Sequence, residues 1–129
     1  MVEANQFAAT ASGTVTSLSI YLDSSNQASA LGLALYRDAA GVPGSLIAHG
    51  SLPTVQNGAW NSVAIPPTSL VAGTRYWIAR LSTSGGDLVT RITSTQPSPD
   101  RVDIRVTTTF PATFSPGASY PHRTSMYAR

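Results

Sequence analysis

The stretch LGLALYRDAAGVPGSLIAHG (residues 31–50) contains two apolar segments separated by a turn. In the first segment Leu31, Leu33 and Leu35 recur at every second position, which is the period of a β-strand with one buried face. This segment stops at Asp38, and a second apolar segment follows the turn. The stretch therefore predicts two strands joined by a tight reversal, with the leucines of the first strand facing a core.

The turn itself has residues that favour a tight reversal. Asp38 can cap the turn through a side-chain oxygen, because aspartate accepts hydrogen bonds from nearby backbone amides. Gly41 and Gly44 can adopt positive φ, and Pro43 restricts its own φ. We therefore expect the motif to be a structural turn.

A bound calcium ion is the functional alternative for this turn. Calcium takes about six to eight oxygen ligands, and one carboxylate with a few carbonyl groups offers fewer than that. Asp38 is one candidate ligand, and Asp23 and Asp87 lie in comparable polar, glycine- or serine-containing segments. Calcium is therefore kept as a possible cofactor at one of these three aspartates.

The period of two continues along most of the chain, and no segment has a helical period. Turn signals separate the apolar segments about every ten residues, which is typical of an antiparallel sandwich. We predict an all-β fold with one domain over residues 1–129: an antiparallel β-sandwich, jelly-roll-like, with about eight or nine strands. Besides 31–37, clear strands are expected at 15–22, 60–65, 75–81 and 101–107, and weaker ones at 4–10, 46–52, 88–93 and 124–128.

Two tryptophans lie near the beginnings of expected strands. Trp60 follows Gly58, and Trp77 follows Gly73 after a few residues. Large rings at such positions close the ends of a sandwich core. Both are therefore expected to be buried, and replacement of either by alanine is expected to be severe.

Composition excludes several classes of function. The net charge is +2, and the eight basic residues, all arginines, are scattered rather than gathered into a stripe that could follow a phosphate backbone. Nucleic acid is therefore not an expected partner. No apolar run approaches the roughly 18 residues of a membrane span, so membrane insertion is not expected either.

Catalysis is not expected. The chain has no cysteine and no lysine, which removes thiol nucleophiles and lysine Schiff bases. His49 and His122 belong to no metal-binding motif, and the GxSxG sequence of serine hydrolases is absent. We therefore expect a non-catalytic protein.

Residues 35–50 also resemble the pattern L-Y-x-D-x-x-G-x-P-G-x-L-x-A-x-G of accessory β-sandwich modules in large secreted bacterial proteins. NQFAATASGTVTSLSIYL (residues 5–22) looks like the opening strands of such modules, and GAWNSVAI (58–65) and AGTRYWIA (72–79) look like their middle strands. The resemblance implies a sandwich fold in a secreted or cell-surface bacterial protein, beside catalytic domains or anchors. Some of these modules bind carbohydrate.

Carbohydrate binding is the first functional hypothesis, with a polysaccharide or cell-surface glycan as the partner. The candidate side chains for contact with a sugar are Tyr21, Tyr36, Trp60, Tyr76, Trp77, Tyr120, His122 and Tyr127. Tyr21 and Tyr36 are singled out, because they lie opposite leucine faces and are expected to point outward and to form a surface on which sugar rings stack. The segment FSPGASYPHRTS (114–125) adds Tyr120, His122 and Arg123 as a rim.

A structural or self-assembling module is the alternative: a spacer, adhesin segment, fibre subunit or virion-surface domain. Only 11% of the residues are charged, and low charge permits association between copies. The segment RVTTTFPATF (105–114) has no charge after Arg105 and could pair with the edge of another chain. Neighbouring copies of the chain are the partners in this case.

Overall fold

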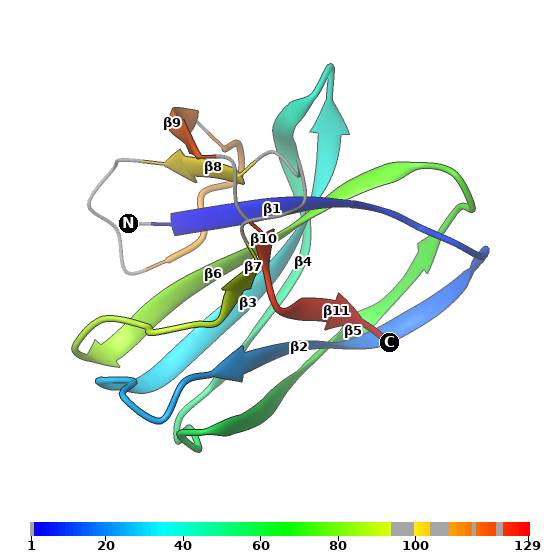
Figure 1. Cartoon of the computed structure of the whole chain (residues 1–129). Coiled ribbons are helices and arrows are strands. Elements are labelled where there is room, and N and C mark those ends of the chain that lie inside the picture. Colours follow the sequence, from blue (N-terminus) through cyan, green and yellow to red (C-terminus); the bar gives the residue numbers. More distant parts are fainter. Residues whose placement is uncertain (1, 94–99, 104–108, 115, 121–122) are drawn as a thin grey trace.

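The structure is a computed structural model that describes the 129-residue chain except residues 1, 94–99, 104–108, 115 and 121–122 (Figure 1). Side chains are described outside residues 1, 92–108 and 115–123. The described residues form strands and turns without a helix, which confirms the all-β prediction. No helix in this part of the chain is long and apolar enough to cross a membrane.

Long strands make up the first two thirds of the chain, and short ones follow in the described parts of the last third. The number of strands differs from the expected eight or nine, because the strand at Pro116–Tyr120 was not expected and the expected strand at 124–128 is divided between two short ones. The long strands are β1 (Val2–Ala8), β2 (Gly13–Leu22), β3 (Ala28–Ala39), β4 (Val42–Leu52), β5 (Ala59–Leu70) and β6 (Arg75–Gly85). The short ones are β7 (Ile92–Thr93), β8 (Asp100–Asp103), β9 (Pro116–Tyr120), β10 (Arg123–Thr124) and β11 (Met126–Ala128).

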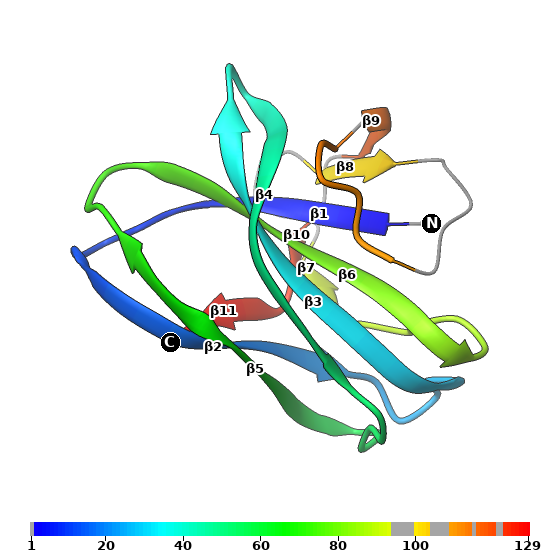
Figure 2. The same cartoon turned by 180° about the vertical axis from the view of Figure 1, so that it is seen from behind.

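Two antiparallel sheets pack against each other (Figures 1 and 2). The larger sheet has the strand order β4-β3-β6-β1-β8-β9, and the smaller one has the order β11-β2-β5. A short pair, β10-β7, completes the described strands. The predicted antiparallel arrangement of layered strands is thus present.

The core between the sheets is built from the residues that the period of two placed inside. The alternating apolar side chains of β2, β3 and β5 are all nearly or completely buried and form one cluster. Burial of such side chains contributes about 1.5–3 kcal/mol each relative to full exposure, which makes this cluster the main source of stability. The cluster includes Leu18, Ile20, Leu22, Leu31, Leu33, Leu35, Val63 and Ile65.

The larger sheet has a second apolar layer on its outer face. Tyr36 of β3 and Trp77 of β6 are completely buried there, together with Phe114. The Tyr36 hydroxyl donates to the Pro111 carbonyl over 2.7 Å, and its ring meets Phe114 edge to face at 5.4 Å. Strands β3 and β6 are therefore buried on both faces, where the period of two predicted strands with one buried face.

The turn between β3 and β4 is built from Ala40 and Gly41. Both residues have positive φ, 54° and 85° respectively, which is the signature of a two-residue type I′ hairpin turn. Asp38 Oδ2 accepts a hydrogen bond from the Gly41 amide at 3.2 Å, so the predicted cap is present. The expectation for Gly44 was wrong, because its φ is not positive. Gly44 is instead closely packed, and an added Cβ would lie 2.9 Å from the Cβ of Ala39.

Candidate functional site

The outer face of the smaller sheet carries three aromatic side chains, which we call the aromatic cluster: Tyr21 of β2, Trp60 of β5 and Tyr127 of β11. Tyr21 is directly opposite Trp60 in the β2–β5 register, and Tyr127 is opposite Ser19 of β2. Trp60 is 48% exposed, Tyr127 is 39% exposed, and Tyr21 is half-buried. Their neighbours along each strand point into the core, so the aromatic rings lie on the solvent side.

The rings of the cluster are in contact and steeply inclined to one another. The centroids of Tyr21 and Trp60 are 5.6 Å apart with an interplanar angle of 78°. Those of Trp60 and Tyr127 are 4.9 Å apart with an angle of 61°. Such edge-to-face pairs are favourable for aromatic rings, so the cluster holds its shape without a ligand.

A charged pair flanks the cluster. The guanidinium carbon of Arg91 lies 5.1 Å from the centre of the Tyr21 ring, a cation–π arrangement. Arg91 Nε is also 3.5 Å from Asp23 Oδ1. Hydrogen bonds from the Ser25 hydroxyl and amide to Asp23 Oδ2, helped by the charge of Arg91, lower the pKa of Asp23 below its usual value. The Asp23 carboxylate is therefore ionised at neutral pH and faces the guanidinium of Arg91.

The side chain of Asn26 links three chain segments next to the aromatic cluster, at the end of β2. Its side chain is buried and donates to the Ala28 carbonyl at 2.8 Å and to Asn57 Oδ1 at 2.9 Å. Its Oδ1 accepts from the Val89 amide at 3.1 Å. The loop before β3, the turn before β5 and the segment leading to Arg91 are consequently fixed relative to one another.

The arrangement can recognise a polar molecule that also has an apolar face. Exposed ring surface from Trp60 and Tyr127 offers apolar contact, while Arg91 donates and Asp23 accepts hydrogen bonds. The exposed Ser62 contributes a hydroxyl group on the same face, and its Oγ lies 2.7 Å from Oγ of the buried Ser19.

Of the predicted sugar-stacking residues, Tyr21 is in the cluster and Tyr36 is not. The prediction that Tyr36 points outward to the solvent was wrong, because its exposed fraction is 0%. Tyr36 does lie opposite the leucine face, but that second face of the larger sheet is covered by Phe114 and its neighbours. Tyr21 and Tyr36 also belong to different sheets, so they form no joint surface.

The predicted rim of Tyr120, His122 and Arg123 cannot be placed. His122 lies outside the described residues, and so do the side chains of Tyr120 and Arg123. The backbone of Tyr120 ends β9, and that of Arg123 begins β10. Their part in ligand binding stays a prediction.

The three candidate calcium ligands lie at separate places. Asp38 accepts hydrogen bonds at Oδ1 from Trp77 Nε1 and Gln6 Nε2, both at 2.8 Å, besides the Gly41 contact at Oδ2. Asp23 belongs to the pair beside the aromatic cluster, and Asp87 lines a pocket elsewhere. Within the described part of the chain, no three His, Cys, Asp or Glu side chains are grouped so that they could hold a metal ion. Calcium binding stays a prediction.

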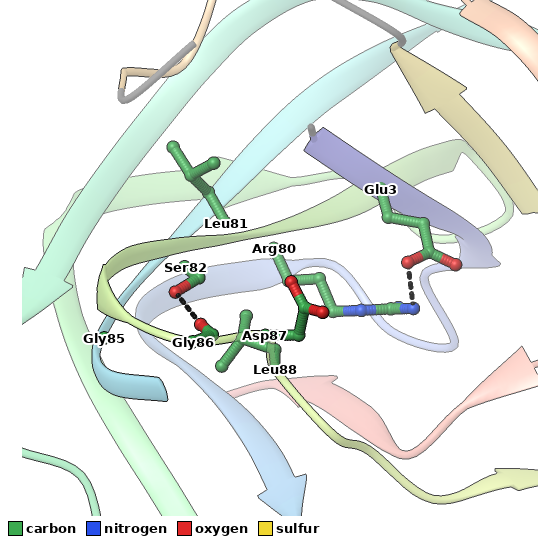
Figure 3. Close-up of a pocket in the computed structure, with 8 residues that line it drawn as sticks. All are labelled: Glu3, Arg80, Leu81, Ser82, Gly85, Gly86, Asp87 and Leu88. Carbon is green, nitrogen blue, oxygen red and sulfur yellow. Dashed lines mark hydrogen bonds and ion pairs between the residues drawn. The ribbon is translucent and has the colours of Figure 1, made fainter. Parts of the chain in front are cut away.

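Asp87 faces a pocket of about 510 Å³ that also exposes parts of Glu3 and Arg80 (Figure 3). Arg80 is buried and forms an ion pair with Glu3 at 2.5 Å. Its Nη1 also donates to Asn5 Oδ1 at 3.2 Å and to Thr124 Oγ1 at 2.6 Å. These contacts join β1, β6 and β10. We therefore infer that Arg80 stabilises the fold and does not bind a ligand.

Arg91 is the site residue that the sequence prediction missed, whereas Trp60 and Tyr127 were among the aromatic candidates but were not singled out. Trp60 was expected to be buried, and that expectation was wrong. The signal was present in the sequence: Val63 and Ile65 face the core, so alternation places Trp60 on the opposite, outer face. For Arg91 no local pattern indicated the contact, because its partners Tyr21 and Asp23 are far away along the chain.

Comparison with known proteins adds no assignment, since no family model, no curated protein and no solved structure matches the chain. The resemblance to accessory modules of secreted bacterial proteins therefore stays a prediction.

Proposed function

We propose that this domain is a non-catalytic carbohydrate-binding module whose ligand lies on the aromatic cluster. The observation that carries the proposal is the exposure of Trp60 and Tyr127 on an otherwise hydroxyl-rich sheet face. Exposed aromatic rings cost free energy in water, and a sheet face that keeps two of them beside polar groups suits a ligand with both apolar and polar sides. Pyranose rings have this character.

Binding would use the two kinds of contact in different ways. A ring face of Trp60 or Tyr127 covers the apolar C–H face of a sugar. Arg91 donates and Asp23 accepts hydrogen bonds at the sugar hydroxyls, and such bonds to charged groups are stronger than neutral ones. The fixed loops under the site reduce the entropy lost on binding.

Affinity electrophoresis through gels that contain soluble plant and bacterial polysaccharides tests the proposal. Retardation of the wild-type domain that is lost in Trp60→Ala supports it. Val71→Ala is the matched control, because Val71 is also exposed but lies beyond the opposite end of β5. Absence of retardation in every gel at millimolar sensitivity contradicts the proposal.

Self-assembly is the second candidate, since an exposed apolar surface of this kind can also bind another copy of the chain. In that case the partners are neighbouring copies, and the domain acts as a spacer, adhesin, fibre or virion-surface subunit. Sedimentation velocity at increasing concentration separates the two. A monomer at the highest concentration argues against assembly, whereas oligomers that Trp60→Ala dissolves favour it.

The setting is part of the same proposal. We place the domain in a secreted or cell-surface bacterial protein, as the sequence resemblance implies, with a jelly-roll-like course of its strands. The packing of two antiparallel sheets supports this course at the level of architecture.

A further inference from the structure

We infer that the aromatic cluster binds one neutral pyranose unit of a soluble glycan chain, and that it does not adsorb to the flat surface of a crystalline polysaccharide. The inference rests on the proposed carbohydrate-binding function and specifies its ligand. It follows from the angles between the rings, from the position of Arg91 and from the charge of its pair with Asp23.

The ring angles exclude a flat platform. A flat crystalline surface contacts several aromatic rings at once only when the rings share one plane. Here the Trp60 ring is inclined by 78° to Tyr21 and by 61° to Tyr127. A plane laid against the face of Trp60 therefore meets both neighbouring rings far from parallel. The cluster can offer one stacking face, bordered by inclined rings, which matches the size of a single sugar ring.

Tyr21 supports the site instead of stacking on the sugar. Arg91 occupies one face of its ring, and Trp60 contacts the ring edge to face. The Tyr21 hydroxyl donates to the Gly58 carbonyl at 3.1 Å, which fixes the ring. Trp60 and Tyr127 are thus left as the rings with free surface, and Tyr21 is a positioning residue for Trp60 and Arg91.

The charged pair favours a neutral ligand. Arg91 and Asp23 carry opposite charges and sit together beside the cluster. Neighbouring hydroxyls of a neutral sugar can accept from the guanidinium and donate to the carboxylate at the same time. An acidic sugar would gain from Arg91 but meet the Asp23 carboxylate at close range, so the pair gives it no net advantage.

The test uses the whole domain and defined probes. Titration calorimetry is run with cellohexaose, mannohexaose and chitohexaose as neutral chains and with oligogalacturonate as the acidic one. Pull-down is run with microcrystalline cellulose and crystalline chitin. The variants are Trp60→Ala, Trp60→Phe, Tyr127→Ala, Asp23→Asn and the control Val71→Ala.

We expect at least one neutral oligosaccharide to bind and neither crystalline solid to retain the domain. Trp60→Ala should weaken binding by about tenfold or more, Trp60→Phe should restore part of it, and Val71→Ala should leave it unchanged. Asp23→Asn should weaken the binding of the neutral oligosaccharide. Circular dichroism should show that the variant keeps the wild-type fold.

Other outcomes separate this inference from the function on which it rests. Retention on a crystalline solid, or binding of oligogalacturonate alone, overturns the inference and leaves carbohydrate binding in place. Binding of a neutral chain that Trp60→Ala does not weaken also overturns it, because the ligand then lies elsewhere. Failure of every carbohydrate probe overturns both this inference and the proposed function.

Discussion

Trp77 Nε1 donates a hydrogen bond to Asp38 Oδ1 over 2.8 Å, and this bond connects the β3–β4 hairpin to the apolar layer on the outer face of the larger sheet. The same carboxylate oxygen accepts from Gln6 Nε2, and the other oxygen accepts from the Gly41 amide. One aspartate thus satisfies donors from β1, β6 and the turn itself. The turn motif is therefore a structural junction as well as a reversal of the chain.

Replacement of Asp38 by alanine should be costly, because three donors lose their acceptor. We expect Asp38→Ala to lower the free energy of unfolding by about 2–4 kcal/mol, and Asp38→Asn, which keeps one acceptor oxygen, to lower it by less. Chemical denaturation followed by tryptophan fluorescence measures both. Asp87→Asn, at an exposed position, is the control and should change little. An Asp38→Ala variant as stable as the wild type would contradict this account.

The contribution of Asp38 should also depend on pH. Burial raises the pKa of this carboxyl, but the hydrogen bonds from Trp77 and Gln6 outweigh it, so the pKa lies below the usual 3.8. A lowered pKa stabilises the fold above the unfolded value, and this stabilisation is lost as pH falls through the folded value. The stability difference between the wild type and Asp38→Asn should stay constant from pH 7 to about pH 4 and shrink below it. A difference that grows on acidification would refute the assignment.

The two tryptophans should behave oppositely. Trp77 is completely buried, so Trp77→Ala should cost about 3–5 kcal/mol in the free energy of unfolding. Trp60 is about half exposed, so Trp60→Ala should cost about 1 kcal/mol or less, while abolishing most ligand binding. Thermal denaturation of the two variants makes the comparison directly. Equal losses of stability would mean that Trp60 is part of the core.

Alternation along the strands predicted the inner core but not the outer face of the larger sheet. The period of two placed Leu31, Leu33 and Leu35 inside correctly, since it depends only on strand geometry. It placed Tyr36 on the opposite face correctly as well. Whether that face is exposed to solvent depends on Phe114 and its neighbours. These residues are far away along the chain and pack across the face. A local pattern contains no information about such long-range cover.

The candidate site was predictable only in part for the same reason. Tyr21 was singled out, whereas Trp60 and Tyr127 were only general aromatic candidates, although strand alternation alone places Trp60 on the outer face. Tyr127 and Arg91 join them through the antiparallel pairing of β11 with β2 and through the contact between Arg91 and the Tyr21 ring. Pairing partners are chosen by the packing of the whole sandwich, so a strand's own residues do not reveal them.

At Gly50, β4 passes close to β5. An added Cβ would overlap the carbonyl oxygen of Ala64 and lie 2.8 Å from Val63 Cγ1. Backbone atoms cannot move aside cheaply, so we expect Gly50→Ala to cost about 3 kcal/mol or to prevent folding. Gly13→Ala is the control, since nothing lies within 4 Å of its Cβ position. This control should change stability by less than about 0.5 kcal/mol in chemical denaturation. Equal stability of the two variants would show that the strands separate more easily than the structure indicates.

Arg80 should be essential as long as Glu3 remains ionised beside it. Arg80→Met keeps much of the side-chain volume but removes the guanidinium from the Glu3 carboxylate and from the Asn5 and Thr124 oxygens. Removal of one member of a fully buried ion pair costs about 3–5 kcal/mol, whereas replacement of both by apolar residues is often nearly neutral. The Glu3 side chain is partly exposed, so we expect a loss at or below the lower end of this range.

The double variant Arg80→Met with Glu3→Leu should therefore regain much of the stability that Arg80→Met loses. Arg37→Met, at an exposed arginine, should change the free energy of unfolding by less than about 0.5 kcal/mol. A double-mutant cycle in chemical denaturation measures the coupling. Strictly additive losses would mean that the two charges do not depend on each other, and the connection from β6 to β1 would then rest on backbone pairing alone.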